Sequence, residues 1–299
     1  MVSKDNNNKL PKLTKRKDVS IMAKCLCKNC INEGVHKVAI DKRGGGFGYI
    51  CNFHYYNEEG YSRENGFRYG NRKVNGYTFS MELETSHSDE KARAELLDFG
   101  FLPTSDCTVD VEYKSPIYEG LCAISKQTLS IEKLMQNGNL GINHTCGTHF
   151  HVGHASKINP NTMNYIRRFY HSLFVPLSDY MAEHRAETAA FWGRDFLESG
   201  WAMPINANTE ASNHRNFINV EHGYTVEFRL AKFVNAEQYM KVVKFSKAVV
   251  DIVITNFIEH FNEEPNDVRR YPNKTAYRRH KAKVAANKIV KAYEKALNS

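Results

Sequence analysis

The pattern of apolar and polar positions along the chain predicts a mixture of strands and helices. Apolar and polar residues alternate over 76–84, 107–118 and 143–153, as they do in strands with one buried face. A further stretch, 215–232, has the pattern of a hairpin whose turn lies at Gly223. Because strands and helices do not alternate regularly, we expect an α+β domain with a mainly antiparallel sheet.

Helical spacing of apolar residues predicts five helices. They cover residues 87–101, 127–137, 161–185, 236–261 and 274–297. Ser88 is the expected N-cap of the first helix, and Pro176 is expected to kink the third. The fourth helix is the clearest, because Asn235 and Gln238 are spaced as in a capping box.

The composition is that of an ordinary globular protein. The chain has 299 residues, of which 41% are hydrophobic and 25% are charged. It has no apolar run near the roughly 20 residues that a membrane helix needs, and its first residues lack the apolar core of a signal peptide. The seven cysteines are odd in number and unevenly spread, which argues against a disulfide framework. We therefore expect a cytoplasmic protein that does not contact a membrane.

Positive charge is concentrated at the two ends of the chain. The first 43 residues hold 11 Lys and Arg against 4 Asp and Glu, and residues 265–299 hold 10 against 2. The formal net charge of the whole chain is +8, which leaves −7 on residues 44–264. An acidic body is suited to binding cations, whereas the basic ends could contact nucleic acid or simply be solvated.

These features divide the chain into four parts. We expect a disordered basic N-terminus over 1–22, a cysteine-bearing module over 23–56, a main domain over 74–262 and a basic helical tail over 263–299. The apolar residues that share one face of the tail helix are Ala285, Ile289 and Tyr293.

Two short motifs near the N-terminus predict a structural zinc site in the module over 23–56. Each motif places two metal-binding side chains three positions apart, and the four ligands are Cys27, Cys30, Cys51 and His54. A Cys₃His set at this spacing suits a tetrahedral structural zinc, which can fold a segment too small for its own core. Gly44–Gly46 would form a hairpin tip between the motifs. Cys25 remains an alternative to Cys27, and His36 is a further candidate.

Three predicted strands each direct a pair of ionisable side chains to one face, because alternate residues of a strand share a face. The pairs are Glu82 and Glu84, His149 and His151, and Glu227 and Arg229. A solvated strand face usually mixes Lys with small polar residues, and these three faces carry no Lys. Together they favour a metal and phosphate site built on a sheet.

The residue types in these strands fit phosphoryl transfer from ATP. Mg²⁺ prefers oxygen ligands, and Glu112 on the 107–118 strand adds a further carboxylate. His149 could complete a metal site. Arg215 and Arg229 could hold phosphate oxygens, because a guanidinium binds them in a bidentate way. Metal ions that bridge ATP phosphates would then support transfer of a phosphoryl group.

The order of five motifs resembles the amidoligase family, which is related to glutamine synthetase and to glutamate–cysteine ligase. The resemblance covers roughly residues 76–258 and depends most on the third and fifth motifs. In chain order the motifs are Met81–Glu84, Val111–Pro116, Cys146–Val152, Arg215–Val220 and Thr225–Arg229.

This resemblance implies a glutamine-synthetase-like catalytic sheet with helices packed on one side. It implies ATP and two or more Mg²⁺ or Mn²⁺ ions. By similarity, one metal would be held by Glu84 and Glu112, and the metal that bridges the transferred phosphate by Glu82, His149 and Glu227. The resemblance also implies that Arg229, Arg215 and Glu227 are catalytic, and that Arg229, Arg215 and His151 contact the nucleotide.

The implied reaction joins a carboxylate to an amine through an acyl phosphate, giving an amide or isopeptide bond. The amine or carboxylate could belong to a peptide, a protein or an acceptor linked to nucleic acid, and related folds often form homo-oligomers. The chain departs from the family at Tyr77–Ser80, where a glycine often precedes the first Glu. The zinc module and the basic tail lie outside the family core.

Three alternative functions compete with the ligase. The zinc module and the basic ends fit a nucleic-acid-binding protein without catalysis. A zinc hydrolase could use the histidine cluster His144, His149, His151 and His154. Cys146 could act as a nucleophile beside His149, although no strand-to-helix elbow follows it.

Overall fold

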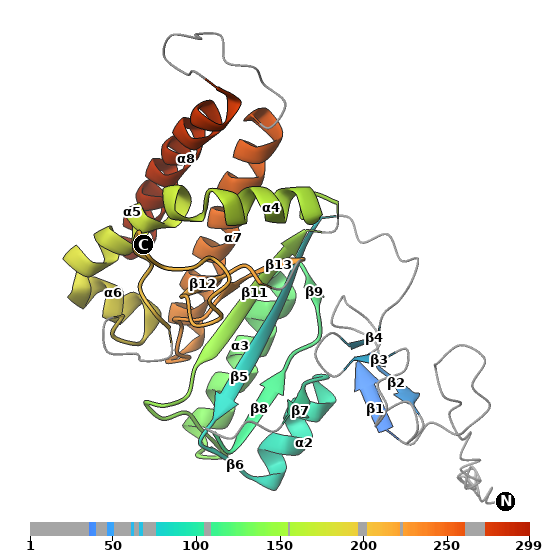
Figure 1. Ribbon diagram of the computed structural model, residues 1–299. Coiled ribbons are helices and arrows are strands. Elements are labelled where there is room, and N and C mark those ends of the chain that lie inside the picture. The colour runs from blue at the N-terminus through green and yellow to red at the C-terminus, as the bar shows by residue number, and fades with distance from the viewer. Residues whose placement is uncertain are drawn as a thin grey trace, which may run out of the picture.

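A computed structural model describes residues 76–104, 109–154, 156–196, 202–221, 224–260 and 273–299, together with four short strands nearer the N-terminus. Its centre is a seven-stranded sheet in which every pairing is antiparallel (Figure 1). In spatial order, the strands are β12 (Ile218–Asn219), β13 (Thr225–Phe228), β11 (Thr148–His154), β5 (Tyr77–Thr85), β8 (Val111–Lys114) and β7 (Leu102–Thr104), and β9 (Tyr118–Glu119) also pairs with β5. The predicted α+β class and antiparallel sheet are therefore confirmed.

Seven helices lie in the described part of the chain. They are α2 (Glu90–Asp98), α3 (Leu121–Gln136), α4 (Pro160–Arg168), α5 (Tyr170–Glu183), α6 (Arg185–Trp192), α7 (Ala236–His260) and α8 (Lys274–Leu297). Helices α3 and α7 pack together behind the sheet, and α8 packs on α5 and α7 (Figure 1). None of these helices is both long and apolar enough to cross a bilayer.

The alternation in β5 gives the sheet one apolar and one polar face. Phe79, Met81 and Leu83 are buried with the apolar residues of the helices, while Glu82 and Glu84 point to the opposite face. The long central strand pair β5–β11 thus separates the core from a polar surface that carries the ionisable residues.

The prediction for 236–261 is confirmed almost to the residue. The Asn235 side chain accepts a hydrogen bond from the Gln238 backbone N–H at 2.8 Å, as an N-cap does. The second half of the capping box does not form, because Gln238 Oε1 accepts no hydrogen bond from the described residues. The side chain is instead held by its Nε2, which donates to the carbonyl of Phe191 in α6.

The first two helices begin elsewhere than predicted. Ser88 belongs to β6 (His87–Ser88), which pairs with β10 (Leu140–Gly141), and Asp89 caps α2 by accepting from the Ala92 N–H. Helix α3 starts six residues before the predicted 127. Its N-terminal residue follows Gly120, which has φ +92° and offers no side-chain cap, so the usual start signal is missing.

The helical segment predicted over 161–185 is divided at Phe169 and not at Pro176. Helix α5 runs through Pro176 without interruption, and its neighbours Leu173, Phe174 and Leu177 are buried. Packing on both sides of the proline keeps the helix continuous despite the lost hydrogen bond.

Two predicted strands are shorter in the structure. The 107–118 strand is divided into β8 and β9 at Ser115-Pro116, where Ser115 Oγ accepts from the Met81 N–H and Pro116 cannot donate. The 143–153 strand starts only at Thr148, because Asn143 Oδ1 accepts from the Thr145 N–H and shapes a turn before it.

Near the N-terminus, β1 (His36–Ala39) pairs antiparallel with β2 (Phe47–Ile50), one on each side of the predicted glycine tip. A second small pair joins β3 (Tyr61–Ser62) to β4 (Gly66–Phe67). The predicted zinc ligands Cys27, Cys30, Cys51 and His54 lie outside the described residues.

Candidate active site

Strand register aligns the candidate residues in rows across the polar face of the sheet. Glu82 of β5 pairs with His149 of β11 on one side and with Lys114 of β8 on the other. In the next row, Glu84 pairs with Glu112. A third row lies on the opposite side of the Glu82–His149 row from Glu84. In it, His151 pairs with Glu227 of β13, which in turn pairs with Asn219 of β12. Paired residues share a face, so five strands contribute to one cluster.

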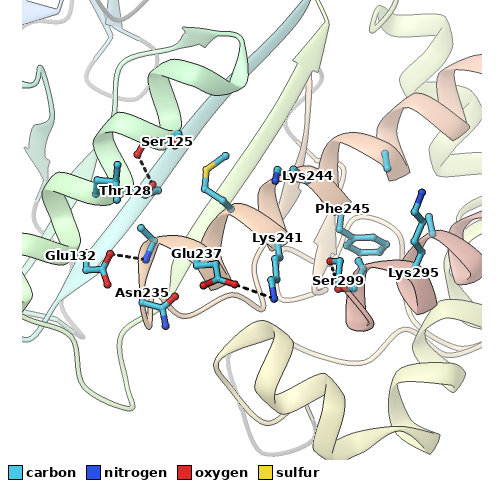
Figure 2. A pocket seen from close by; sticks show the side chains of 16 residues that line it. Ser125, Thr128, Glu132, Asn235, Glu237, Lys241, Lys244, Phe245, Lys295 and Ser299 are labelled. Atoms are coloured by element: carbon cyan, nitrogen blue, oxygen red, sulfur yellow. Dashed lines mark hydrogen bonds and ion pairs between the residues drawn. The ribbon is translucent and has the colours of Figure 1, made fainter.

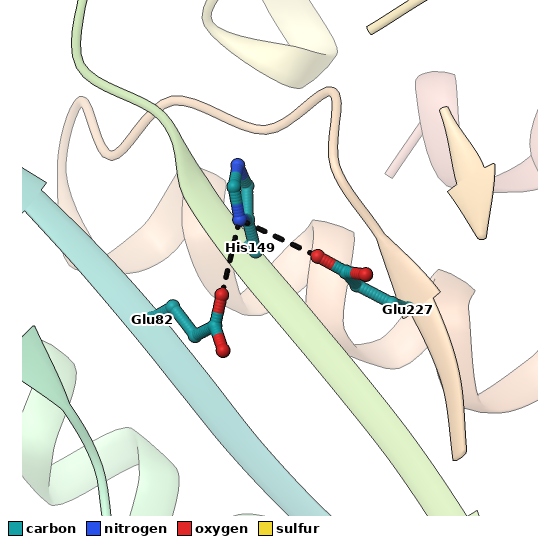
Figure 3. Close-up of side chains that lie close together, drawn as sticks. All are labelled: Glu82, His149 and Glu227. Carbon is teal, nitrogen blue, oxygen red and sulfur yellow. Dashed lines mark hydrogen bonds and ion pairs between the residues drawn. The ribbon is translucent and has the colours of Figure 1, made fainter. Parts of the chain in front are cut away.

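His149 lies at the centre of this cluster (Figure 3). Its Nδ1 atom is 3.2 Å from Glu82 Oε2 and 3.4 Å from Glu227 Oε1. Its Nε2 atom lies on the side of Glu84, 3.5 Å from Oε1. The two ring nitrogens therefore face different carboxylates.

Two overlapping groups could each hold a metal ion. The ligand atoms of Glu82, His149 and Glu227 lie within 4.8 Å of one another, and so do those of Glu84, Glu112 and His149. Carboxylate oxygens with one imidazole are ligands that suit Mg²⁺ or Mn²⁺, whereas sets of thiolates favour zinc. The chemistry of the donors therefore fits a divalent cation.

Gly147 leaves space beside the second group. A Cβ atom at this position would lie 3.1 Å from His149 Nε2 and 3.2 Å from Glu84 Oε2. Its backbone N–H donates to the Glu84 carboxylate, so it also orients this ligand. The glycine keeps the approach to both ligands open.

Glu227 is completely buried and is held by two donors. Arg229 Nη1 donates to Oε1 and Asn219 Nδ2 donates to Oε2, each at 2.7 Å. A buried carboxylate needs such partners to remain charged. This arrangement presents an oriented carboxylate toward His149.

The electrostatics of Glu82 and Glu112 differ. Burial opposes ionisation of Glu82, but His151 and His149 outweigh it and hold the pKa of Glu82 well below its usual value. Burial and the charge of Glu82 raise the pKa of Glu112, against the opposing effects of Lys114 and of a 2.8 Å hydrogen bond from Thr104. Burial and the charge of Glu82 therefore disfavour the carboxylate form of Glu112, and a bound cation would stabilise it.

Lys114 is a site residue that the sequence prediction missed. Its ammonium lies 3.1 Å from Glu82 Oε1 and 3.7 Å from Glu112 Oε2. The three strands themselves carry no Lys on this face, as the sequence indicates, but the neighbouring strand β8 supplies one. The available signal was the spacing of Glu112 and Lys114, two positions apart on one strand.

A second missed residue, Arg194, approaches the Glu84 end of the cluster. It follows Gly193, the left-handed C-cap of α6, and donates to the carbonyl of Cys146. Burial lowers its pKa, while the charge of Glu84 acts in the opposite direction. No local pattern marked this residue, because a loop far away in sequence brings it to the site.

The remaining predicted residues lie at different distances from the cluster. His151 Nε2 is 3.5 Å from Glu82 Oε1, so His151 is part of it. Arg215 is solvent-exposed, three residues before β12, and it is not among the residues that approach His149 in the described part of the chain.

The histidine and cysteine alternatives gain no support from the geometry. His144 is exposed, and His154 lies on the opposite face of β11 from His149, with its ring 4.8 Å from that of Tyr77. Cys146 is buried, and its Sγ lies 3.3 Å from Asn143 Oδ1. The four histidines therefore do not converge on one zinc ion.

A second, larger cavity is separate from this cluster. A cavity of about 980 Å³ lies among α3, α7 and α8, on the helical side of the molecule (Figure 2). Its charged side chains include Glu132, Lys244 and an ion pair of 3.4 Å between Lys241 and Glu237. None of the candidate site residues lines it, so the size of this cavity does not identify the active site.

Comparison with known families agrees with the site geometry. A family model described as "Putative amidoligase enzyme" matches residues 35–250, more than two thirds of the chain. No curated protein matches the chain significantly. The family match begins at residue 35, so it takes in part of the segment 23–56 that was expected to lie outside the family core. The match contains every carboxylate and histidine of the cluster, and the chain belongs to the amidoligase family.

Proposed function

We propose that this protein is an ATP-dependent carboxylate–amine ligase that forms an amide or isopeptide bond through an acyl phosphate. The observation that carries the proposal is the convergence of four carboxylates, His149 and Arg229 on one face of the sheet. The family assignment independently supports a ligase.

Two groups of residues would hold divalent cations. These are Glu82, His149 and Glu227, and Glu84, Glu112 and His149. Cations bound there would neutralise the charge of the ATP phosphates. The protein keeps both groups in place through the sheet register and through the hydrogen bonds from Asn219, Thr104 and Gly147.

Arg229 is placed to contact a transferred phosphoryl group. Its Nη1 is used by Glu227, whereas its buried Nε has no hydrogen-bond partner in the part of the chain that the structure describes. A guanidinium offers five N–H donors in a fixed plane, so its other donors can bind phosphate oxygens. Glu227 would hold this plane in a fixed orientation.

In the proposed reaction, a substrate carboxylate oxygen attacks the γ-phosphorus of ATP. The bond from this phosphorus to the β,γ-bridging oxygen breaks, ADP leaves and an acyl phosphate forms. The amine nitrogen then attacks the acyl carbon, the bond to the phosphate oxygen breaks, and the nitrogen loses a proton. The side chains act by positioning the reactants and stabilising charge, without a covalent enzyme intermediate.

Glu227→Gln and Arg229→Ala test this function. Glu227→Gln removes the charge of a proposed metal ligand, and Arg229→Ala removes the proposed donor to the phosphoryl group, so we expect ADP release to fall by about 100-fold or more in each. ADP release would be measured with Mn²⁺ against a panel of amines and carboxylates. Glu237→Gln is the control, because Glu237 lies on α7 with its side chain 85% exposed. Full activity of either site variant would contradict the assignment.

A further inference from the structure

We propose that a small cavity beside Glu82 binds the substrate carboxylate, and that Lys114 and Arg229 are the residues that bind it. This inference rests on the proposed ligase function, and it identifies a binding site for the carboxylate substrate. The ligand would be a small, polar carboxylic acid about the size of an amino acid.

The cavity lies on the polar face of the sheet, next to the candidate metal groups. Its volume is about 280 Å³. Residues of β5, β8, β11 and β13 contribute to its lining, and its main polar side chains are Ser80, Glu82, Lys114, His151, Thr225 and Arg229. Four strands therefore build it, and its position is fixed by their register.

The charge of the lining favours an anion. Lys114 and Arg229 are basic residues and His151 adds an imidazole, whereas Glu82 is the only carboxylate that lines the cavity in the described part of the chain. The hydroxyl groups of Ser80 and Thr225 add hydrogen-bond donors. An ionised carboxylate can therefore exchange its hydration for charge-assisted hydrogen bonds.

The two oxygens of Glu82 face different surroundings. Oε2 is 3.2 Å from His149 Nδ1, on the side of the metal group. Oε1 is 3.1 Å from Lys114 Nζ and 3.5 Å from His151 Nε2, both of which line the cavity. Glu82 thus stands between the metal group and the cavity, which places a bound carboxylate next to the phosphoryl-transfer site.

The size of the cavity limits the ligand. Pockets for drug-sized ligands have volumes of roughly 300–1,000 Å³, and this cavity is slightly below that range. Apart from Met81 and Ile117, its lining is mostly polar. An extended apolar acid would therefore bind weakly, because it would separate these polar groups from water without forming hydrogen bonds with them.

The test is a calorimetric titration of the full chain, loaded with Mn²⁺, with glycine, propionate and succinate. Inorganic phosphate is titrated in parallel as an anion of different geometry. We expect at least one carboxylate to bind to the wild type, and Lys114→Met to weaken that binding about tenfold or more. The Mn²⁺ affinity of this variant should not fall, because both metal groups keep their ligands when the ammonium beside Glu82 and Glu112 is removed.

Two further variants separate binding from folding. Lys114→Arg keeps the cation and should retain carboxylate binding within about threefold, so that the loss in Lys114→Met can be assigned to the missing charge. Ser80→Leu fills the cavity from β5 without changing a metal ligand, and it should abolish carboxylate binding while Mn²⁺ still binds.

Each outcome has a defined meaning. Equal carboxylate affinity in the wild type and Lys114→Met, or binding of phosphate alone, would overturn the cavity assignment. Binding of none of the three acids to wild-type protein that does bind Mn²⁺ and ATP would also overturn it, and would leave the ligase function standing. Failure of the wild type to bind Mn²⁺ and ATP would instead refute the ligase function itself.

Discussion

Glu227 shows how hydrogen bonds can satisfy a carboxylate that has no solvent exposure. Arg229 and Asn219 each donate to one of its oxygens, and His149 lies on its open side. The sequence predicted that Glu227 and Arg229 share a face, because they are two positions apart on a strand. It could not predict that they pair with each other, since this depends on the position of the neighbouring strands.

Gly147→Ala tests the space next to His149. The added Cβ would lie within 3.2 Å of both His149 Nε2 and Glu84 Oε2, so we expect Mn²⁺ affinity to fall about tenfold or more. The free energy of unfolding of the metal-free protein should change by less than about 1.5 kcal/mol. Mn²⁺ titration by calorimetry and urea unfolding measure the two effects.

Gly141→Ala is the matched control for this variant. A Cβ there would also be crowded, 3.2 Å from Ser86 Oγ and 3.3 Å from His87 Cβ, but away from the metal groups. It should leave Mn²⁺ affinity unchanged. If Gly147→Ala also binds Mn²⁺ normally, Glu84 and His149 do not share a metal.

At the scale of elements, the sequence predicted the type of the long periodic segments. Their boundaries could be predicted only where a capping residue marked them. Asn235, as an N-cap residue, predicted the start of α7. The alternation of residues along β11 predicted the face shared by His149 and His151. Gly120 supplied no cap, so the first turns of α3 were missed. Arg194 was missed for another reason, because tertiary folding alone brings its loop beside Glu84.

Helix α8 packs as part of the helical layer. The predicted face of Ala285, Ile289 and Tyr293 is buried, and the Trp192 indole donates to the Tyr293 hydroxyl at 3.0 Å. The element that carries much of the positive charge near the C-terminus is thus also part of the core.

Ile289→Ala measures the contribution of α8 to stability. Ile289 is fully buried, so we expect the free energy of unfolding to fall by about 2–5 kcal/mol. Val284→Ala on the same helix is the control, since Val284 is 39% exposed and should cost no more than about 0.5 kcal/mol. Urea unfolding of both variants tests this, and equal effects would show that α8 does not stabilise the fold.

At the scale of the whole molecule, the sheet separates two environments. Helices cover the apolar face, and the opposite face collects carboxylates, histidines and cations from four strands. The larger cavity belongs to the helical side, whereas the chemistry lies on the strand side. Side-chain chemistry therefore located the site better than cavity size did.

Buried tyrosines predict a loss of stability at alkaline pH. Burial raises the pKa of Tyr165 to about 12 and also raises those of Tyr118, Tyr170 and Tyr293. Because these folded-state pKa values exceed the unfolded value of about 10, the folded protein holds more protons above that pH, and stability falls as the pH rises.

Urea unfolding between about pH 8 and pH 11 measures this effect. The contribution of the tyrosines to the free energy of unfolding should be constant below about pH 9 and should decrease above it. Phenolate absorbance, followed in parallel, should appear together with unfolding. Ionisation of all tyrosines near pH 10 in a still folded protein would contradict the packing described for them.

The most direct test of the central claim is the thermal stability of the protein with ATP and Mn²⁺, in the wild type and in Glu227→Gln. At ligand concentrations about 100-fold above Kd, binding should raise the Tm of the wild type by about 5 °C or more. The rise should require the metal and should be absent in the variant. An equal, metal-dependent rise in Glu227→Gln would contradict the placement of the ATP–metal site on these strands.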